Sequence, residues 1–269
     1  MQNESWQQAH EKTDNFLKKV IHPIFPNARY SSSFMMGTPE EAPNNFKGIL
    51  SPESLFKGTD YLYQGTGRFI HYTSLFALKS ILESGYLRMS EFGNLIDKNE
   101  LKYAAAVFSN NPIFKFDEHK LESLKDNLFC LSACKSNNKT KKNSFMWDNY
   151  GDKGKGAIIE FEFTKKDPYS YLFGNVQYGN ESLIPLKKIK KLAELFFKDN
   201  DGFFPNNFIE ILLSIQSFHK PKKYNIEDEV RIFMKEEKQQ YKEHKHETIY
   251  KDINSNHEVK YFNKPVGCN

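Results

Sequence analysis

The chain has 269 residues and a formal net charge of +4, from 38 basic and 34 acidic residues. A hydrophobic fraction of 39% and an aromatic fraction of 15% exclude wholesale disorder, and the length is sufficient for a large buried core. The small net charge gives no support to nucleic-acid binding by itself. Three cysteines, Cys130, Cys134 and Cys268, form neither a disulfide framework nor a repeated metal-ligand spacing, which is typical of a reducing compartment.

Residues 1–60 combine polar, helix-like segments with "FPNARYSSSFMMGTPEEAPNNF", which shows no sustained hydrophobic period. We interpret them as an N-terminal extension or lid, mainly helical and irregular, in front of a main domain at residues 61–269. The first residues lack the order of a signal peptide, and the most apolar window, "FIEILLSIQSF", is too short to cross a membrane. We therefore expect a cytoplasmic protein, or one delivered to a host cytosol without a Sec signal peptide, and no membrane partner.

A strand followed by a helix is the clearest local pattern. "GRFIHYT" predicts the strand and "SLFALKSILESGYLRM" the helix. Thr73 or Ser74 can cap the start of the helix, and Gly85 can end it. The apolar residues of the helix repeat at helical spacing: Leu75, Leu78, Ile81 and Leu82.

Further strands and helices follow in irregular alternation. Strands are predicted at "DNLFCLSACKS", Ala157–Phe163, "DEVRIFM" and "HEVKYF", and helices at "FMWDNY", "PLKKIKKLAELFF" and "NNFIEILLSIQSF". The helix predicted at "PLKKIKKLAELFF" has one apolar stripe, formed by Leu186, Ile189, Ala193 and Phe196. Because the strands show no regular βαβ period, we predict an α+β fold rather than a doubly wound one.

Several motifs do not indicate a site. "GDKGKGA" lacks the Ser or Thr of a phosphate loop and leads into a strand, and "HKH" at residues 244–246 has no further ligand at a recognised spacing. No metal is expected. The loop "KSNNKTKKNS" has two interpretations, a solvated loop or a place where Lys135, Lys139, Lys141 and Lys142 attract a phosphate or an acidic partner.

Four separated pieces contain polar or aromatic residues beside predicted strands: "FIHYTSLFALKSILESGYL", "FCLSACKS", "FMWDNYGDKGKGAIIEF" and "HKPKKYNIEDEVRIF". Each piece alone has a structural explanation, such as core aromatics or surface charge. In the last piece, strand alternation predicts that Glu227, Glu229 and Arg231 share one face, while Asp228 lies on the other.

Taken in order, the four pieces resemble a large bacterial family defined only as a domain of unknown function. Its members carry an "hYts…l.sIl.sG" opening, an "MW..Y…kG" centre and a "Y/W..E.E.R" close, and the resemblance covers Phe69 to Phe233. The opening and close are also similar to the mono-ADP-ribosyltransferase superfamily, which includes bacterial effectors and toxins. The chain departs from many relatives at "IDKNE", which keeps Asp97 and Glu100 but lacks the Asn and Pro of an Asn-Asp-Pro-x-Glu turn.

This resemblance implies a split mixed sheet with flanking helices, a catalytic domain at residues 61–269, and NAD as a co-substrate. It implies that Glu229 stabilises the oxocarbenium-like charge that develops when nicotinamide leaves the ribose. The opening strand would bind the ribose and the nicotinamide amide, through His71, Tyr72 and Thr73. Ser132 would support these groups, and Trp147 or Tyr150 would offer an aromatic face to nicotinamide.

The order Glu227-Asp228-Glu229 is similar to the E-x-E pair of superfamily members that modify arginine, in which the first glutamate holds the acceptor. A guanidinium can make paired hydrogen bonds to a carboxylate, which suits Glu227 to that role. The resemblance therefore implies an enzyme that modifies a protein side chain, with arginine as the expected acceptor. Transfer to nucleic acid, hydrolysis of NAD, and a non-catalytic binding module remain as alternatives.

Overall fold

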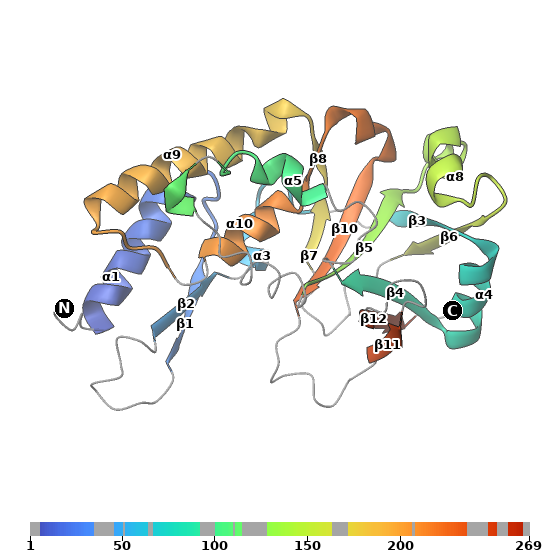
Figure 1. Ribbon diagram of the computed structural model, residues 1–269, viewed down its shortest axis with the longest axis horizontal. Coiled ribbons are helices and arrows are strands. Elements are labelled where there is room, and N and C mark those ends of the chain that lie inside the picture. The colour runs from blue at the N-terminus through green and yellow to red at the C-terminus, as the bar shows by residue number, and fades with distance from the viewer. Residues whose placement is uncertain are drawn as a thin grey trace. The chain divides into compact units, whose positions relative to one another are not determined.

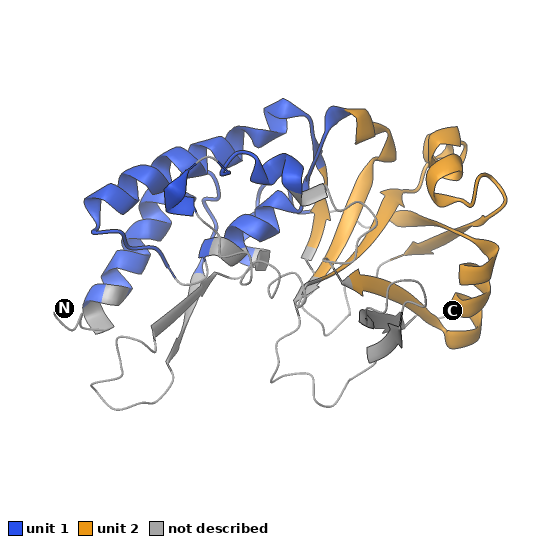
Figure 2. Cartoon of the chain, in the orientation of Figure 1, with its two compact units in different colours: residues 1–62, 99–116, 177–222 blue, residues 63–98, 117–176, 223–269 orange. Residues whose placement is uncertain are grey.

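The computed structural model describes residues 6–34, 46–50, 52–63, 67–91, 100–109, 111–114, 128–162, 172–205, 208–235, 247–251 and 258–265. It combines helices with antiparallel sheet, so the predicted α+β class is confirmed. The chain divides into two compact units (Figure 1 and Figure 2). Unit 1 consists of residues 1–62, 99–116 and 177–222, and unit 2 of residues 63–98, 117–176 and 223–269. The N-terminal segment is thus one part of a unit that also takes in two later stretches.

Unit 1 is mainly helical and is held together by phenylalanine rings. Its elements are α1 (Trp6–Phe16), η1 (Leu17–Ile21), β1 (Tyr30–Phe34), β2 (Phe46–Leu50), α3 (Pro52–Phe56), α5 (Glu100–Ala105), η3 (Pro112–Phe114), β8 (Gln177–Tyr178), η4 (Asn180–Leu183), α9 (Ile184–Asp199), α10 (Phe208–Gln216) and β9 (His219–Lys220). The predicted stripe of α9 is confirmed, since all four of its residues are buried. The Phe16 ring of α1 lies edge-on to Phe196 of α9 and Phe208 of α10, with centroids 5.2 and 4.9 Å away.

Unit 2 contains a large sheet and the helices beside it. Its elements are β3 (Arg68–Thr73), α4 (Leu75–Ser84), β4 (Tyr86–Glu91), β5 (Leu128–Lys135), α7 (Asn138–Lys141), α8 (Ser144–Tyr150), β6 (Ala157–Glu162), β7 (Leu172–Asn175), β10 (Glu229–Lys235), β11 (Glu247–Lys251) and β12 (Glu258–Pro265). The turn η5 (Lys222–Glu227) begins at the last residue of unit 1 and leads into β10.

The large sheet is branched. Eight strands are seen in the described part of the chain, in the order β11-β12-β4-β5-β10-β7, with β3 also paired to β5, and β6 paired to β3. Every one of these pairings is antiparallel, so the expectation of a mixed sheet is wrong. The mixed sheet was expected from the family resemblance alone, because strand direction depends on pairings between segments far apart in the chain, which hydrophobic patterns do not specify.

Helix α4 has the predicted ends. The Ser74 hydroxyl accepts a hydrogen bond from the Ala77 amide at 3.1 Å, and Gly85 ends the helix with a φ of 70°. The residues after Gly85 form β4, a strand that we did not predict. The apolar residues of α4 are also less covered than their spacing suggests, because no residue of this helix is buried.

Candidate active site at the fork of the sheet

The sheet divides beside Ser132. One edge of β5 pairs with β10. Two strands share the other edge: β4 pairs with it at Phe129 and Cys130, and β3 pairs with it at Cys134 and Lys135. We call the divergence of β4 and β3 along β5 the fork. Because the two strands separate there, backbone groups of β5 near Ser132 become accessible to side chains.

The His71 ring fills part of this opening. Its Nδ1 lies 3.2 Å from the carbonyl oxygen of Ser132. A carbonyl only accepts, so Nδ1 carries the proton and Nε2 of the neutral ring is an acceptor. Burial lowers the pKa of His71 below its ordinary value, and the hydrogen bond to Ser132 opposes this shift only in part. The imidazole is therefore neutral at pH 7.

The two faces of the sheet separate His71 from Glu229. Ile70, Tyr72 and Cys134 pack together with Met146 of α8, and we call this side the α8 face. Glu229 pairs directly with Cys134, so its side chain lies on the α8 face. His71 alternates with Ile70 and Tyr72 and thus starts on the opposite face, reaching Ser132 at the fork.

Glu229 is the first residue of β10 and is bound by a neighbour on the same strand. The Arg231 side chain donates from Nε to Glu229 Oε1 at 2.8 Å and from Nη2 to Oε2 at 3.3 Å. The exposed fractions are 4% for Glu229 and 0% for Arg231, so the ion pair is withdrawn from solvent. Ser132 lies opposite Arg231 in the ladder, which puts its side chain on the same face. Arg231 was placed on the correct face by alternation, but its pairing with Glu229 was not predicted.

Side-chain contacts help to fix the turn before β10. Asn143 Nδ2 donates to the Ile226 carbonyl at 3.2 Å, and the Tyr150 hydroxyl donates to Glu227 Oε1 at 2.8 Å. Lys135 Nζ lies 3.3 Å from Asp228 Oδ1. Asn143 was not among the predicted site residues, and an asparagine in a polar loop gives no signal of this contact in the sequence.

This turn changes the predicted alternation. Glu227 ends η5 rather than lying in β10, and Asp228 has a positive φ of 43°. Glu227 is nevertheless 2% exposed, while the Asp228 side chain is 46% exposed. Both glutamates are therefore buried and the aspartate points outward, but a left-handed residue produces this arrangement instead of a continuous strand.

Two aromatic side chains, Tyr72 and Trp147, pack against each other on the α8 face. The Tyr72 and Trp147 rings lie edge-on with centroids 5.3 Å apart, and Trp147 Nε1 donates to the Lys141 carbonyl at 2.9 Å. The Tyr72 hydroxyl donates to the Thr140 carbonyl, and burial raises the pKa of Tyr72 to about 12. Thr73 is buried and pairs with Ala157 of β6. These contacts give Tyr72, Trp147 and Thr73 a structural role whatever binds beside them.

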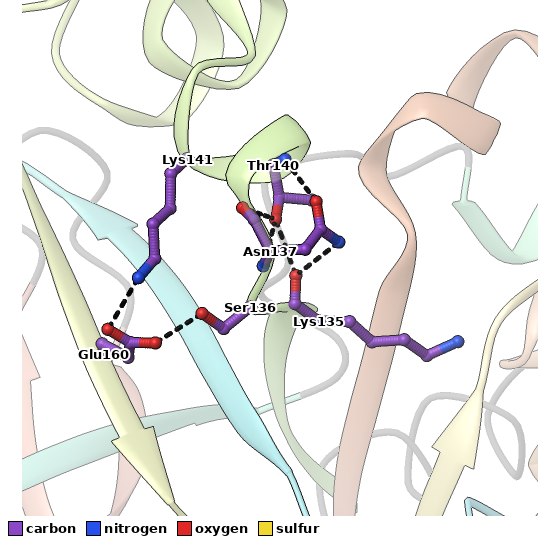
Figure 3. Close-up of polar contacts among 6 residues, drawn as sticks. All are labelled: Lys135, Ser136, Asn137, Thr140, Lys141 and Glu160. Atoms are coloured by element: carbon purple, nitrogen blue, oxygen red, sulfur yellow. Dashed lines mark hydrogen bonds and ion pairs between the residues drawn. The ribbon is translucent and has the colours of Figure 1, made fainter.

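The lysine-bearing loop after β5 is ordered by its own polar groups (Figure 3). Asn137 and Thr140 form a capping box, with the Asn137 side chain accepting from the Thr140 amide at 2.8 Å. Glu160 accepts from the Ser136 hydroxyl at 2.5 Å and from Lys141 Nζ at 2.9 Å. The Ser136 hydrogen bond, followed by that from Lys141, holds the pKa of the Glu160 carboxyl below its usual value. Lys141 thus forms an ion pair with a carboxylate of the chain, as Lys135 does with Asp228.

A comparison of the chain with family models, with curated protein sequences and with solved structures finds no match. Within the described ranges, no helix is long and apolar enough to cross a membrane. The same ranges contain no group of three or more His, Cys, Asp or Glu residues arranged to hold a metal ion. The assignment of a function therefore depends on the chemistry of the fork.

Proposed function

We propose that this protein is an NAD-dependent mono-ADP-ribosyltransferase that modifies a protein side chain, with arginine as the expected acceptor. The observation that carries the proposal is the pairing of β3 and β10 with opposite edges of β5, with His71 starting on one face of the sheet and Glu229 lying on the other. The His71 ring of β3 bonds to the Ser132 carbonyl of β5, and Glu229 heads β10, which pairs with β5. An ADP-ribosyltransferase-like arrangement of the split sheet is part of the same proposal.

Glu229 has the chemical properties that the reaction requires. The bond between nicotinamide nitrogen and ribose C1′ breaks, nicotinamide leaves with the bonding electrons, and positive charge develops on the ribose. A carboxylate fixed at the start of a strand stabilises that charge without reorganising. Arg231 fixes both oxygens of Glu229, so the carboxylate is preoriented although part of its charge is balanced.

His71 is suited to bind NAD, and Glu227 is suited to bind the acceptor. A neutral His71 can accept a hydrogen bond from a ribose hydroxyl at Nε2 while Nδ1 stays bonded to Ser132. Glu227 can orient a guanidinium, whose nitrogen bonds to C1′ and releases one proton to the solvent. Since the Tyr150 hydroxyl occupies Oε1 of Glu227, a guanidinium that uses both carboxylate oxygens has to displace that hydroxyl.

One observation favours a second candidate, a non-catalytic binding module with the same fold. Buried carboxylates are commonly paired for structural reasons, and the Glu229–Arg231 pair is almost fully buried. In that case Glu229 would stabilise β10 without contacting a ligand.

Incubation of the protein with labelled NAD and a cell lysate distinguishes these functions. We expect label on protein, and its loss on treatment that removes arginine-linked ADP-ribose. Label on nucleic acid would instead indicate transfer to nucleic acid, and free ADP-ribose alone would indicate hydrolysis of NAD. Intact NAD would favour the non-catalytic module. Asp228→Asn is the matched control for Glu229→Gln, because it removes the neighbouring outward-facing carboxylate.

A further inference from the structure

The solvent-facing side of helix α9 carries charge of predominantly one sign. Figure 1 shows this helix along the upper margin of unit 1. At about 100° per residue, all of its exposed residues fall within an arc of about 120°: Ile184, Lys187, Lys188, Lys191, Leu195, Lys198 and Asp199. We call this arc the α9 face. Lysines dominate it, and Asp199 at the end of the helix is its one acidic residue.

Most of these lysines have no structural role that accounts for their charge. Lys188 donates a hydrogen bond to the Pro23 carbonyl at 3.1 Å. Lys187, Lys191 and Lys198 form neither a hydrogen bond nor an ion pair with any residue that the structure describes. Lys187 and Lys191 are one turn apart, and like charges at this spacing destabilise a helix. Positive charge that the fold does not use, and that opposes helix formation, indicates a negatively charged partner.

Two large aliphatic side chains project from the middle of the α9 face. Ile184 is 60% exposed and Leu195 is 50% exposed. They lie within about 20° of each other around the helix axis and about 16 Å apart along it, with lysines between them. A helix face that is only solvated normally has polar residues at such positions. The α9 face therefore offers apolar contacts as well as positive charge.

This combination fits the anionic surface of a lipid bilayer. Lysine clusters on an amphipathic helix attract the negatively charged headgroups of lipids such as phosphatidylserine. Ile184 and Leu195 can enter the acyl region independently of each other, whereas a protein partner needs a pocket matched to each. Nucleic acid fits less well, because the α9 face has no arginine for paired contacts with bases and no aromatic ring for stacking on them.

We propose that the α9 face binds an anionic lipid surface, with its lysines at the headgroups and with Ile184 and Leu195 inserted between the lipids. The expectation of no membrane partner was based on the length of the apolar segments, and a helix that lies against a bilayer does not need a long one. A few charges and two aliphatic side chains give weak, reversible and salt-sensitive binding. The proposal does not depend on the proposed enzymatic activity.

Co-sedimentation with lipid vesicles tests the charge on the α9 face. We expect the protein to bind vesicles of phosphatidylserine and phosphatidylcholine, to bind less at high salt, and not to bind vesicles of phosphatidylcholine alone. Lys191→Glu should weaken binding at least about fivefold, which is the contribution expected of one lysine at an anionic surface. Lys79→Glu is the matched control. It makes the same charge change on α4 of unit 2, at a side chain that is 73% exposed, and should have much less effect.

A second pair of variants tests the aliphatic contacts. Leu195→Ser should weaken binding to the anionic vesicles about fivefold, because serine gains little from insertion among lipids. Leu82→Ser, at an exposed leucine of α4, is its control and should leave binding unchanged. Circular dichroism checks that each variant is folded.

Three results would overturn the proposal. One is no binding to the anionic vesicles, or equal binding to the neutral ones. Another is vesicle binding that Lys191→Glu or Leu195→Ser leaves unchanged. The third is binding of a DNA duplex without binding of vesicles, weakened by Lys191→Glu and not by Leu195→Ser, which would identify the α9 face as a nucleic-acid site instead.

Discussion

Arg231 and Glu229 are two residues apart on β10, and their side chains bind each other on the α8 face, with Nε 2.8 Å from Oε1. The pair combines two roles that are normally separate. It holds the carboxylate that we propose to be catalytic, and it satisfies a buried guanidinium in the middle of the sheet.

Removal of one partner should therefore destabilise the fold. We expect Glu229→Ala to lower the free energy of unfolding by about 3–5 kcal/mol, because it removes a buried carboxylate that accepts two hydrogen bonds from the Arg231 guanidinium. Glu229→Gln also removes the charge but keeps an acceptor oxygen for the guanidinium, so it should cost less than Glu229→Ala. Urea denaturation followed by circular dichroism measures both. The double variant Glu229→Met/Arg231→Met should recover much of the loss, and a double variant less stable than Glu229→Ala would contradict a simple buried ion pair.

The hydrogen bond from Tyr150 to Glu227 should also contribute measurable stability. Hydrogen bonds to charged groups are worth about 1.5–3 kcal/mol, so Tyr150→Phe should destabilise the protein by an amount in that range. The control is Tyr103→Phe, which removes a tyrosine hydroxyl that donates to the neutral Asn180 side chain at 3.1 Å, and should cost about 1 kcal/mol or less. In a double-mutant cycle with Glu227→Gln, additive effects would show that Tyr150 and Glu227 do not interact.

Two glycines of the turn after α8 make a matched pair. A Cβ at Gly156 would overlap the Thr73 carbonyl oxygen and lie 2.8 Å from the Gly151 oxygen, so Gly156→Ala should cost about 3 kcal/mol. A Cβ at Gly154 meets no atom within 4 Å, and Gly154→Ala should cost only about 1 kcal/mol for its φ of 80°. Thermal or urea unfolding of both variants gives the comparison. Equal costs would mean that β3 shifts freely near Thr73.

His219 should make the protein less stable in mild acid. Burial lowers the pKa of His219 from 6.5 to about 4, and its ring lies between the Tyr61 and Ser182 hydroxyls at 2.9 and 3.1 Å. The unfolded chain therefore binds more protons than the folded protein between these values. The contribution of the buried, neutral His219 to the free energy of unfolding is complete above pH 6.5 and is lost as the pH falls toward 4. A difference of about 2.5 pH units corresponds to about 3 kcal/mol.

Urea unfolding of the parent protein and of His219→Gln at pH 7.5 and pH 5 measures this contribution. The loss of stability between the two pH values should be smaller in the variant. Carboxylates titrate in both proteins, so the difference between their losses isolates His219. An equal loss in both would show that His219 does not titrate on unfolding as its burial requires.

Local structure followed from local sequence signals in this chain. Ser74 and Gly85 predicted the two ends of α4, and helical spacing predicted the buried stripe of α9, because capping and amphipathicity depend on neighbouring residues. The same spacing did not show how little of α4 is covered. Periodicity identifies the residues that share a face, but a helix buries that face only where another element lies against it.

The candidate site was predictable in part for the same reason. Strand spacing put Glu229 and Arg231 on one face, where they are found. Strand spacing failed at Asp228. The positive φ of this residue interrupts the alternation, so Glu227 lies in the preceding turn and not in the strand. The branching of the sheet beside Ser132 depends on the pairing of Ser90 with Cys130 and of Phe69 with Lys135, and pairings between segments so far apart in the chain leave no periodic trace in the sequence.

The rate of nicotinamide release from NAD tests the central claim most directly, measured for the parent protein, Glu229→Gln and Asp228→Asn at equal folded concentration. The proposal predicts that the parent protein releases nicotinamide, that Glu229→Gln lowers the rate by on the order of a hundredfold or more, as expected for loss of a charge-stabilising group, and that Asp228→Asn stays near the parent rate. No release by the parent protein, or an undiminished rate in Glu229→Gln, would contradict it.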